Sequence, residues 1–275
     1  MPGSAFVEHS PVSLPQAFGE DSGRLTDPNT PAWGVGGAII VWIGSVALLL
    51  LIPVALLLPY AAYRGIAPGN PDYARALSEF VITDKAAIFL QVLAVFPAHL
   101  LTILLVWCLV TRFGRRDFWA SLAWRWDTGL QLWGSLVLGA VLFGVGSGIA
   151  KLLGGDVPTQ LEQIINSSKP ARYLIALLAV ATAPLAEELI YRGVLYSALQ
   201  RALGVTGAVL LVLALFTIVH VPQYWPNYGV IAAVGLLSIS LTVIRAYTNR
   251  LFPCVVIHLV FNGIQAVLLL VSPHT

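Results

Sequence analysis

The feature that most constrains the fold is a series of apolar runs without charged side chains, each long enough to cross a bilayer. A spanning helix needs about 20 apolar residues. Five stretches contain no Asp, Glu, Lys or Arg: residues 28–63, 86–111, 128–150, 202–244 (long enough for two spans) and 251–272. The chain is 10% charged, against about 25% for an ordinary soluble domain. With a further apolar segment at 171–200, these runs predict an all-α, polytopic membrane protein of about seven transmembrane helices.

Composition divides the chain into three parts. Residues 1–31 are polar, rich in Pro, Ser and Gly, and lack the basic start and short apolar stretch of a signal peptide. We therefore expect a disordered N-terminal tail. Residues 32–170 are expected to hold the first three transmembrane helices and their loops, and residues 171–272 a core of four transmembrane helices.

Arginine positions suggest an orientation. Residues 112–127 contain four arginines and are the best candidate for a cytoplasmic loop, because short cytoplasmic loops are enriched in Lys and Arg. Alternation of the spans then places four further basic residues on the same side: Arg192, Arg201, Arg245 and Arg250. The N-terminus is expected in the cytoplasm and the protein in a cell membrane, which in a bacterium is the cytoplasmic membrane. The sequence contains no basic face of the kind that binds nucleic acid.

Two adjacent carboxylates, Glu187 and Glu188, interrupt the apolar segment 171–200. An acid at the centre of a membrane helix costs roughly 2.5 to 3.5 kcal/mol on insertion scales, so it marks a functional site by default. Glu188 and Arg192 are four residues apart and share a helix face, which predicts a structural ion pair. Glu187 points about 100° away and is left free to take a proton, as a general base must. Pro184 is expected to kink the helix and open room there.

Two more pairs have helical spacing: Phe216 with His220 in FTIVH, and His258 with Asn262 in HLVFN. An imidazole and a carboxamide one turn apart can point two donors at one substrate atom, as an oxyanion hole requires. Taken singly, these residues have simpler interpretations. A lone membrane histidine or asparagine often makes only an interhelical hydrogen bond, Phe216 is apolar packing, and His99 is structural or pore-lining.

Two histidines and a glutamate pair on three separate spans are harder to explain by packing alone. We therefore predict an intramembrane active site formed by six residues: Glu187, Glu188, Arg192, His220, His258 and Asn262.

The motifs EExxxR, FxxxH and HxxxN, in this order on successive helices, resemble those of the CPBP (also called Abi) family of intramembrane endopeptidases. This family includes the eukaryotic CAAX prenyl proteases of the glutamate type and bacterial proteins linked to bacteriocin maturation and immunity. The resemblance covers roughly residues 173–270 and marks residues 171–272 as a CPBP-like catalytic core. It implies that Glu187 activates water, which His220 helps to hold. It also implies that His258 and Asn262 stabilise the tetrahedral oxyanion, while the Glu–Arg ion pair shapes the site.

The depth of His220 is one open point. If the fifth span starts at Ala202, His220 lies near its outer end, whereas Glu187 lies nearer the inner side. Either the span starts later and continues past Pro222, or the helix breaks to bring His220 inward.

The metal is a second open point. One carboxylate and two imidazoles, from Glu187, His220 and His258, are enough for a catalytic zinc site. However, the chain contains no HExxH, and asparagine is an uncommon zinc ligand. The family is often called a metalloprotease, yet the same residues also support a glutamate mechanism without metal. Zinc is left open, and we favour the mechanism without metal.

The leading hypothesis is an endopeptidase that hydrolyses a peptide bond of a membrane-associated protein or peptide, in contact with the lipid bilayer. The first alternative is a proton-coupled transporter, because buried Glu, Arg and His also build proton relays. Such a transporter would usually show inverted repeats, and the sequence shows none. The second alternative is a non-catalytic immunity or scaffold protein of the same fold, which would not need to keep all six residues.

Overall fold

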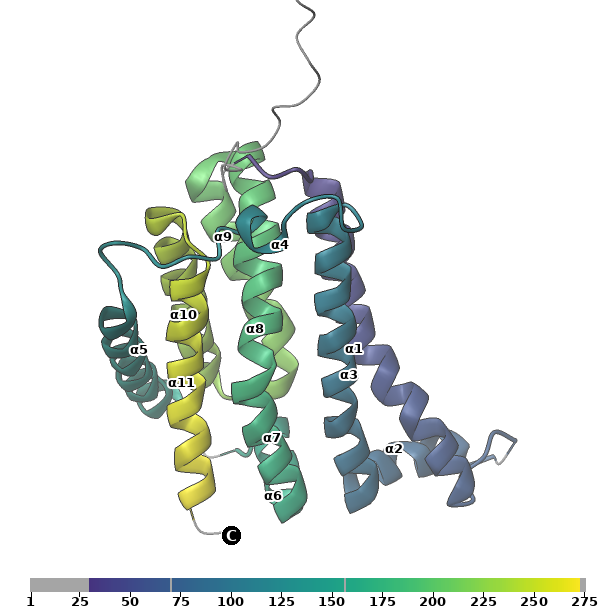
Figure 1. The fold of residues 1–275 in the computed structure, drawn as a ribbon. Helices are drawn as coiled ribbons and strands as arrows, with labels where there is room; N and C mark the ends of the chain where they lie inside the picture. The colour runs from purple at the N-terminus through teal and green to yellow at the C-terminus, as the bar shows by residue number, and fades with distance from the viewer. Residues whose placement is uncertain (1–29, 70, 156, 273–275) are drawn as a thin grey trace, which may run out of the picture.

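The structure, a computed structural model, describes residues 30–69, 71–155 and 157–272. The predicted N-terminal tail lies almost entirely outside these ranges. Within them the chain is helical and contains no strand, which confirms the all-α class. Figure 1 shows the long helices standing side by side, with their connections at two opposite ends. In chain order the elements are α1 (Val35–Tyr63), α2 (Tyr73–Thr83), α3 (Lys85–Thr111), α4 (Phe118–Ser121), α5 (Leu132–Leu153), α6 (Gln160–Ser167), α7 (Lys169–Ala181), α8 (Ala183–Glu188), the π-helix η1 (Leu189–Leu195), α9 (Tyr196–Tyr224), α10 (Tyr228–Thr248) and α11 (Phe252–Val271).

Among the described residues, six helices are long and apolar enough to cross a membrane. One of them, the continuous helical stretch Lys169–Tyr224, has 56 residues. At 1.5 Å per residue it would be about 84 Å long, more than twice the hydrocarbon thickness of about 30 Å. It therefore holds two spans, and the expected number of about seven agrees with the structure. The protein is a multi-pass helical membrane protein.

Gly204 is the point at which this long stretch turns. Its φ of 74° lies in the left-handed region, which a residue with a Cβ adopts only at a cost. The limb before the turn contains α7, α8 and η1. The limb after it is the rest of α9, which continues through Pro222 to Tyr224. Of the two placements considered for the fifth span, the later start is the one observed.

A ring contact fixes the register of this helical hairpin. Tyr191 in the first limb and Phe216 in the second have ring centroids 4.9 Å apart. One helical turn further from Gly204 on each limb are Glu187 and His220. Because both residues are displaced equally from the same contact, they lie at the same depth in the bundle.

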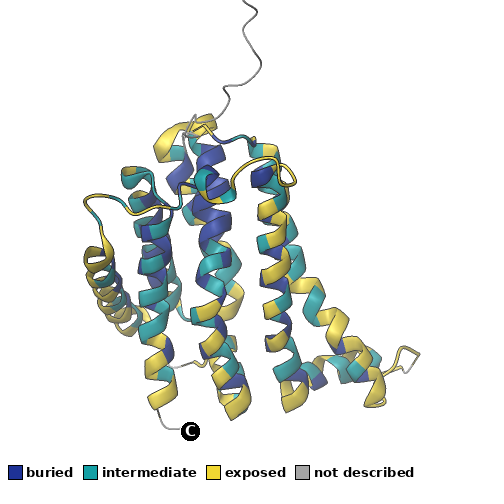
Figure 2. Cartoon of the chain, in the orientation of Figure 1, coloured by how far each residue is buried: buried dark blue, intermediate teal, exposed yellow. Residues whose placement is uncertain are grey.

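Close packing of α5 and α11 supports the other side of the core. A Cβ added to Gly139 of α5 would lie 2.7 Å from the Val260 Cβ and 2.9 Å from the Ile257 carbonyl oxygen. Only glycine therefore lets these two helices approach so closely, as small residues do in other membrane bundles. In Figure 2 the buried residues gather where the central helices meet, and the exposed residues lie on the outward faces. All seven residues of η1 are buried.

The predicted alternation of spans holds, but two arginines were misplaced by it. In Figure 1 the arginine-rich segment around α4 and the connection between α10 and α11 lie at the upper end, whereas α11 runs down to the lower end. Arg192 and Arg245 are fully buried inside the bundle and are not loop residues. Their charges therefore do not count as evidence for a cytoplasmic side, and the orientation itself stays a prediction.

Candidate active site

A buried ion pair lies at the centre of the site. Arg192 Nη1 donates to Glu188 Oε1 at 2.9 Å, and neither side chain is exposed. The ion pair predicted from the four-residue spacing is therefore present. Arg192 also binds two residues of α10. Its Nη2 donates to the carbonyl and hydroxyl oxygens of Ser238, and its Nε donates to Thr242 Oγ1. These bonds satisfy the guanidinium in several directions, as a charge removed from water requires.

The helix widens directly after Glu188. Residues Leu189–Leu195 form a π-helix, a departure from α geometry that is rare and frequent at functional sites. Arg245 of α10 donates from Nε to the Arg192 carbonyl at 3.2 Å and from Nη2 to Ser197 Oγ at 3.3 Å. It thus binds a main-chain oxygen within the π-helix.

Sequence reasoning missed Arg245 as a site component because it was assigned to a loop. A signal was present. Ser238, Thr242 and Arg245 are spaced i, i+4, i+7, which places them on one face of α10, and all three contact the η1 region.

His258 connects the two glutamates. Its Nδ1 lies 2.8 Å from Glu188 Oε1, and its Nε2 lies 3.7 Å from Glu187 Oε2. Because Glu188 Oε1 already accepts a hydrogen bond from Arg192, Nδ1 carries the hydrogen in this contact. The second distance is too long for a direct hydrogen bond, so Nε2 faces the Glu187 carboxylate across a gap. His258 itself is only 2% exposed.

Glu187 differs from its neighbour in access to the surroundings. Its side chain is 21% exposed, whereas that of Glu188 is fully buried. Three further polar side chains lie within electrostatic range of its carboxylate: His99, Tyr191 and Tyr224. Glu188 is thus locked in a network, while Glu187 is the carboxylate that a water or substrate can reach. This is the division expected from the helical angles.

His220 belongs to an aromatic stack. Its Nδ1 lies 2.7 Å from the Phe216 carbonyl oxygen, so Nδ1 donates and Nε2 is left as the acceptor. The ring is stacked between Phe216, at a centroid distance of 4.5 Å, and Tyr224, at 6.4 Å.

Phe216 is more than packing in this stack. Its ring lies 4.8 Å from the Arg192 guanidinium carbon and 6.3 Å from the His258 ring. The ring therefore makes a cation–π contact with the buried guanidinium.

Asn262 makes its hydrogen bond outside the network of the other five residues. Within the described part of the chain, its Nδ2 donates to the Ala179 carbonyl of α7 at 3.0 Å. This is the interhelical contact that sequence reasoning considered for a lone asparagine. The amide still has a second hydrogen, so the contact is compatible with a role toward substrate.

The break predicted near Pro184 is present two residues earlier. Helix α7 ends at Ala181, and Thr182 leaves the helical region with φ −122° and ψ −37°. His99 of α3, which is 6% exposed, lies with its Nδ1 2.8 Å from Thr182 Oγ1. His99 belongs to none of the three motifs. Only its tertiary contact with Thr182 relates it to α8, the helix that carries Glu187 and Glu188 (the glutamate helix).

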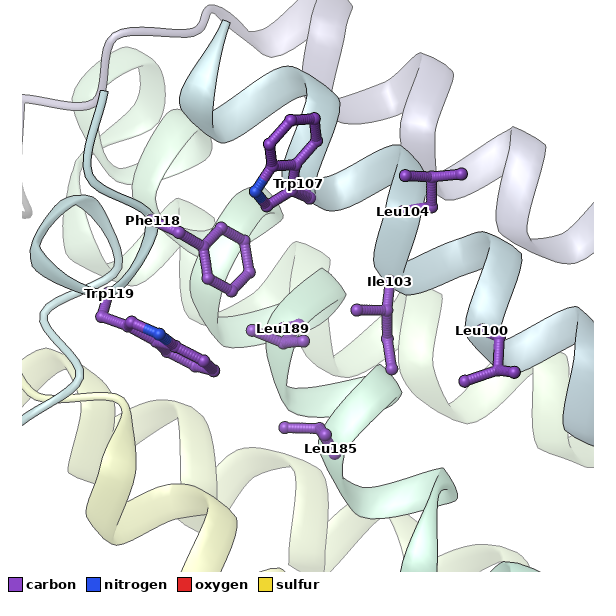
Figure 3. Close-up of a pocket in the computed structure, with 8 residues that line it drawn as sticks. All are labelled: Leu100, Ile103, Leu104, Trp107, Phe118, Trp119, Leu185 and Leu189. Atoms are coloured by element: carbon purple, nitrogen blue, oxygen red, sulfur yellow. The ribbon is translucent and has the colours of Figure 1, made fainter. Parts of the chain in front are cut away.

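An apolar groove runs along the face of the glutamate helix that carries Leu185 and Leu189. It has a volume of about 470 Å³ and lies between α3, α4, α8 and η1. Figure 3 shows Leu185 and Leu189 facing Ile103 and Leu100 across it, with Phe118 and Trp119 at one end. None of the six predicted site residues lines it, so the groove is separate from the polar site.

The donor set was also compared with a zinc site. Among the described residues, no group of three or more His, Cys, Asp or Glu side chains is arranged to hold a metal ion. Each histidine uses Nδ1 toward an oxygen atom, His258 toward Glu188 and His220 toward the Phe216 carbonyl, and keeps Nε2 open. Zinc binding by Glu187, His220 and His258 therefore stays an open prediction.

Comparison with known proteins gives one family. Residues 169–264 match the model of the type II CAAX prenyl endopeptidase Rce1-like family. The matched segment contains all three motifs, which confirms the resemblance indicated by their order and spacing, and it begins after the first three spans. No curated protein and no solved structure matches the chain.

Proposed function

Taking the family match as the premise, we propose that this protein is an intramembrane endopeptidase that hydrolyses a peptide bond of a membrane-associated protein or peptide. The observation that carries the proposal is the contrast between two adjacent carboxylates. Glu188 is closed off by Arg192 and His258, whereas Glu187 is partly exposed beside them. A general base must be within reach of the proton that it accepts. Glu187 meets this condition, and the fixed Glu188 carboxylate belongs to the network beside it.

In the proposed step, Glu187 accepts a proton from a water molecule as the water oxygen bonds to the carbonyl carbon of the scissile peptide. The carbonyl electron pair moves to oxygen and gives a tetrahedral oxyanion. When this species collapses, the C–N bond breaks and the proton held by Glu187 passes to the departing amine. Glu187 thus ends the cycle as it began, and one water is consumed.

His220 and His258 have different parts in this step. His220 donates from Nδ1 to the Phe216 carbonyl, so its Nε2 accepts a hydrogen of the attacking water and orients it. His258 donates from Nδ1 to Glu188, and its Nε2 has a hydrogen to donate only when the ring is protonated. We propose that it stabilises the oxyanion as an imidazolium held between two carboxylates, with the second amide hydrogen of Asn262 as a further donor.

The proposal is tested by comparing membrane-associated peptides from cells that make the wild type and cells that make Glu187→Ala. We expect a small set of cleaved peptides with the wild type that stays uncut with the variant, because the base is missing. Glu79→Ala is the matched control, since Glu79 is an exposed acid on α2 away from the site. Identical peptide sets for wild type and Glu187→Ala would contradict the proposal and favour the proton-coupled transporter.

The mechanism without metal predicts the behaviour of the purified protein. Elemental analysis is expected to find far less than one zinc per chain, and strong chelators should leave cleavage unchanged. His258→Ala should lower turnover about 10²–10³-fold, the usual loss for one oxyanion donor. One tightly bound zinc per chain, lost in His258→Ala and required for cleavage, would overturn this mechanism in favour of a metalloprotease.

A further inference from the structure

The segment that carries the glutamates is a short helix between two irregular points. Helix α8, Ala183–Glu188, has only six residues. It follows the break at Thr182 and leads directly into the π-helix η1. It is part of the continuous helical stretch Lys169–Tyr224, so its rotation follows how the segments on either side of it are held. The direction of the Glu187 side chain therefore depends on what holds the two ends of α8.

The C-terminal end is held by the active-site network. Glu188, its last residue, is bound by Arg192 and His258. Arg192 in turn is bound to α10 through Ser238 and Thr242. This end cannot rotate without breaking several buried charged hydrogen bonds.

The N-terminal end is held in an unusual way. Thr182 occupies the N-cap position of α8, where a threonine hydroxyl normally accepts a hydrogen bond from an amide of the first turn. Here the hydroxyl makes no such cap bond. Pro184, in the first turn, has no amide hydrogen to offer. The hydroxyl is instead 2.8 Å from His99 Nδ1 on α3.

This contact lies in line with the apolar groove of Figure 3. His99 is one turn before Ile103 on α3, and Thr182 is about one turn before Leu185 on the glutamate helix. Both of these apolar residues line the groove. Helices α3 and α8 therefore meet through apolar side chains in the groove and, one turn further, through the buried polar pair His99–Thr182. His99 is within electrostatic range of Glu187, although it lies outside the segment that matches the family model.

The geometry points to His99 as a positioning residue for Glu187: by binding Thr182 at the helix break, it fixes the rotation of α8 and so the direction of the catalytic carboxylate. The inference rests on the proposed function, because it assigns His99 a part in the same site. His99 acts through Thr182 and does not touch the substrate. The imidazole is used here as a hydrogen-bonding group on a fixed helix, so a side chain with the same polar atom in the same place replaces it.

The first arm of the test measures kcat and KM for cleavage. His99→Leu is expected to lower kcat about tenfold or more and to leave KM within about twofold, because only the alignment of the base is lost. Asparagine places an oxygen near the position of Nδ1, so His99→Asn should recover most of the kcat. Thr182→Val should match His99→Leu, and the double variant should be no worse than either, since both break one contact.

Thr102→Val is the matched control. Thr102 is buried on α3 one turn from His99, and its hydroxyl has no hydrogen-bond partner among the described residues. The replacement removes a hydroxyl of the same helix without touching Thr182, and kcat should stay at the wild-type value. If His99→Asn is as slow as His99→Leu, the imidazole itself is needed and the positioning role is wrong. An unchanged kcat in His99→Leu also overturns it.

The second arm needs no substrate. Hydrogen exchange followed by mass spectrometry should show the amides of α8 exchanging about fivefold faster in His99→Leu, the change expected for one lost hydrogen bond. The amides of α10 should be unchanged, and His99→Asn should exchange like the wild type. Equal exchange of α8 in His99→Leu and wild type would refute the clamp. If the peptide sets of wild type and Glu187→Ala are identical, the proposed function fails, while the exchange result stands independently.

Discussion

Replacing Glu187 by glutamine is expected to lower turnover by about two to four orders of magnitude and to leave the protein folded. Glutamine has nearly the same shape but cannot accept the proton of water, and a general base typically contributes 10²–10⁴-fold. Folding should survive because no buried cation loses its partner: Arg192 is paired with Glu188. The Glu187 side chain is also 21% exposed, so the amide can be solvated.

The measurement is the single-turnover cleavage rate of the purified variant, together with its thermal unfolding temperature in detergent. Glu79→Gln, on the exposed face of α2, is the control for loss of an acid elsewhere. A Glu187→Gln protein that is folded and retains more than about a tenth of the wild-type rate would show that another group is the base.

The opposite pattern is expected for the neighbouring residue. Glu188→Gln should lower the free energy of unfolding by about 3–5 kcal/mol, the usual result of leaving one charge of a buried pair without its partner. Neither side chain of the Glu188–Arg192 pair is exposed, so solvent cannot compensate. Cleavage should fall as well, because His258 loses the anion that accepts the hydrogen bond from its Nδ1.

Two comparisons make this result specific. Arg64→Gln breaks the Arg64–Asp84 ion pair, in which Arg64 is 47% exposed, and should change stability little because exposed ion pairs contribute little. The double variant Glu188→Gln/Arg192→Met removes both buried charges and should recover much of the lost stability, without recovering activity. Equal loss of stability in the single and double variants would mean that the pair is not the origin of the effect.

Much of the fold could be predicted from the sequence, because the membrane imposes simple rules. The apolar runs end where the helices end to within a few residues. Residues 86–111 became α3 and residues 251–272 became α11. The four-residue spacing of Glu188 and Arg192 gave the ion pair, since both residues are on one helix and local geometry decides their contact.

Contacts between helices could not be predicted in the same way. The hydrogen bond from Asn262 to Ala179 and that between His99 and Thr182 depend on how far each helix is displaced along its axis. Sequence spacing within one helix contains no information on that displacement. The π-helix also escaped prediction, because one widened turn changes the pattern of apolar residues too little to be distinguished from an α-helix. Arg245 was misplaced because a charge near the end of a span looks the same whether it faces the bundle or the water.

Because the chain turns at Gly204, the number of residues between the EExxxR and FxxxH motifs determines where the two motifs meet in space. EExxxR and FxxxH lie on opposite limbs of one hairpin, and Tyr191 meets Phe216 across it. One residue inserted in a single limb would shift the two motifs by about 1.5 Å and rotate one of them by about 100°. The His220 ring would then no longer lie on the side of the bundle that holds Glu187. Length changes between the motifs are therefore compatible with this site only when they occur within the turn itself.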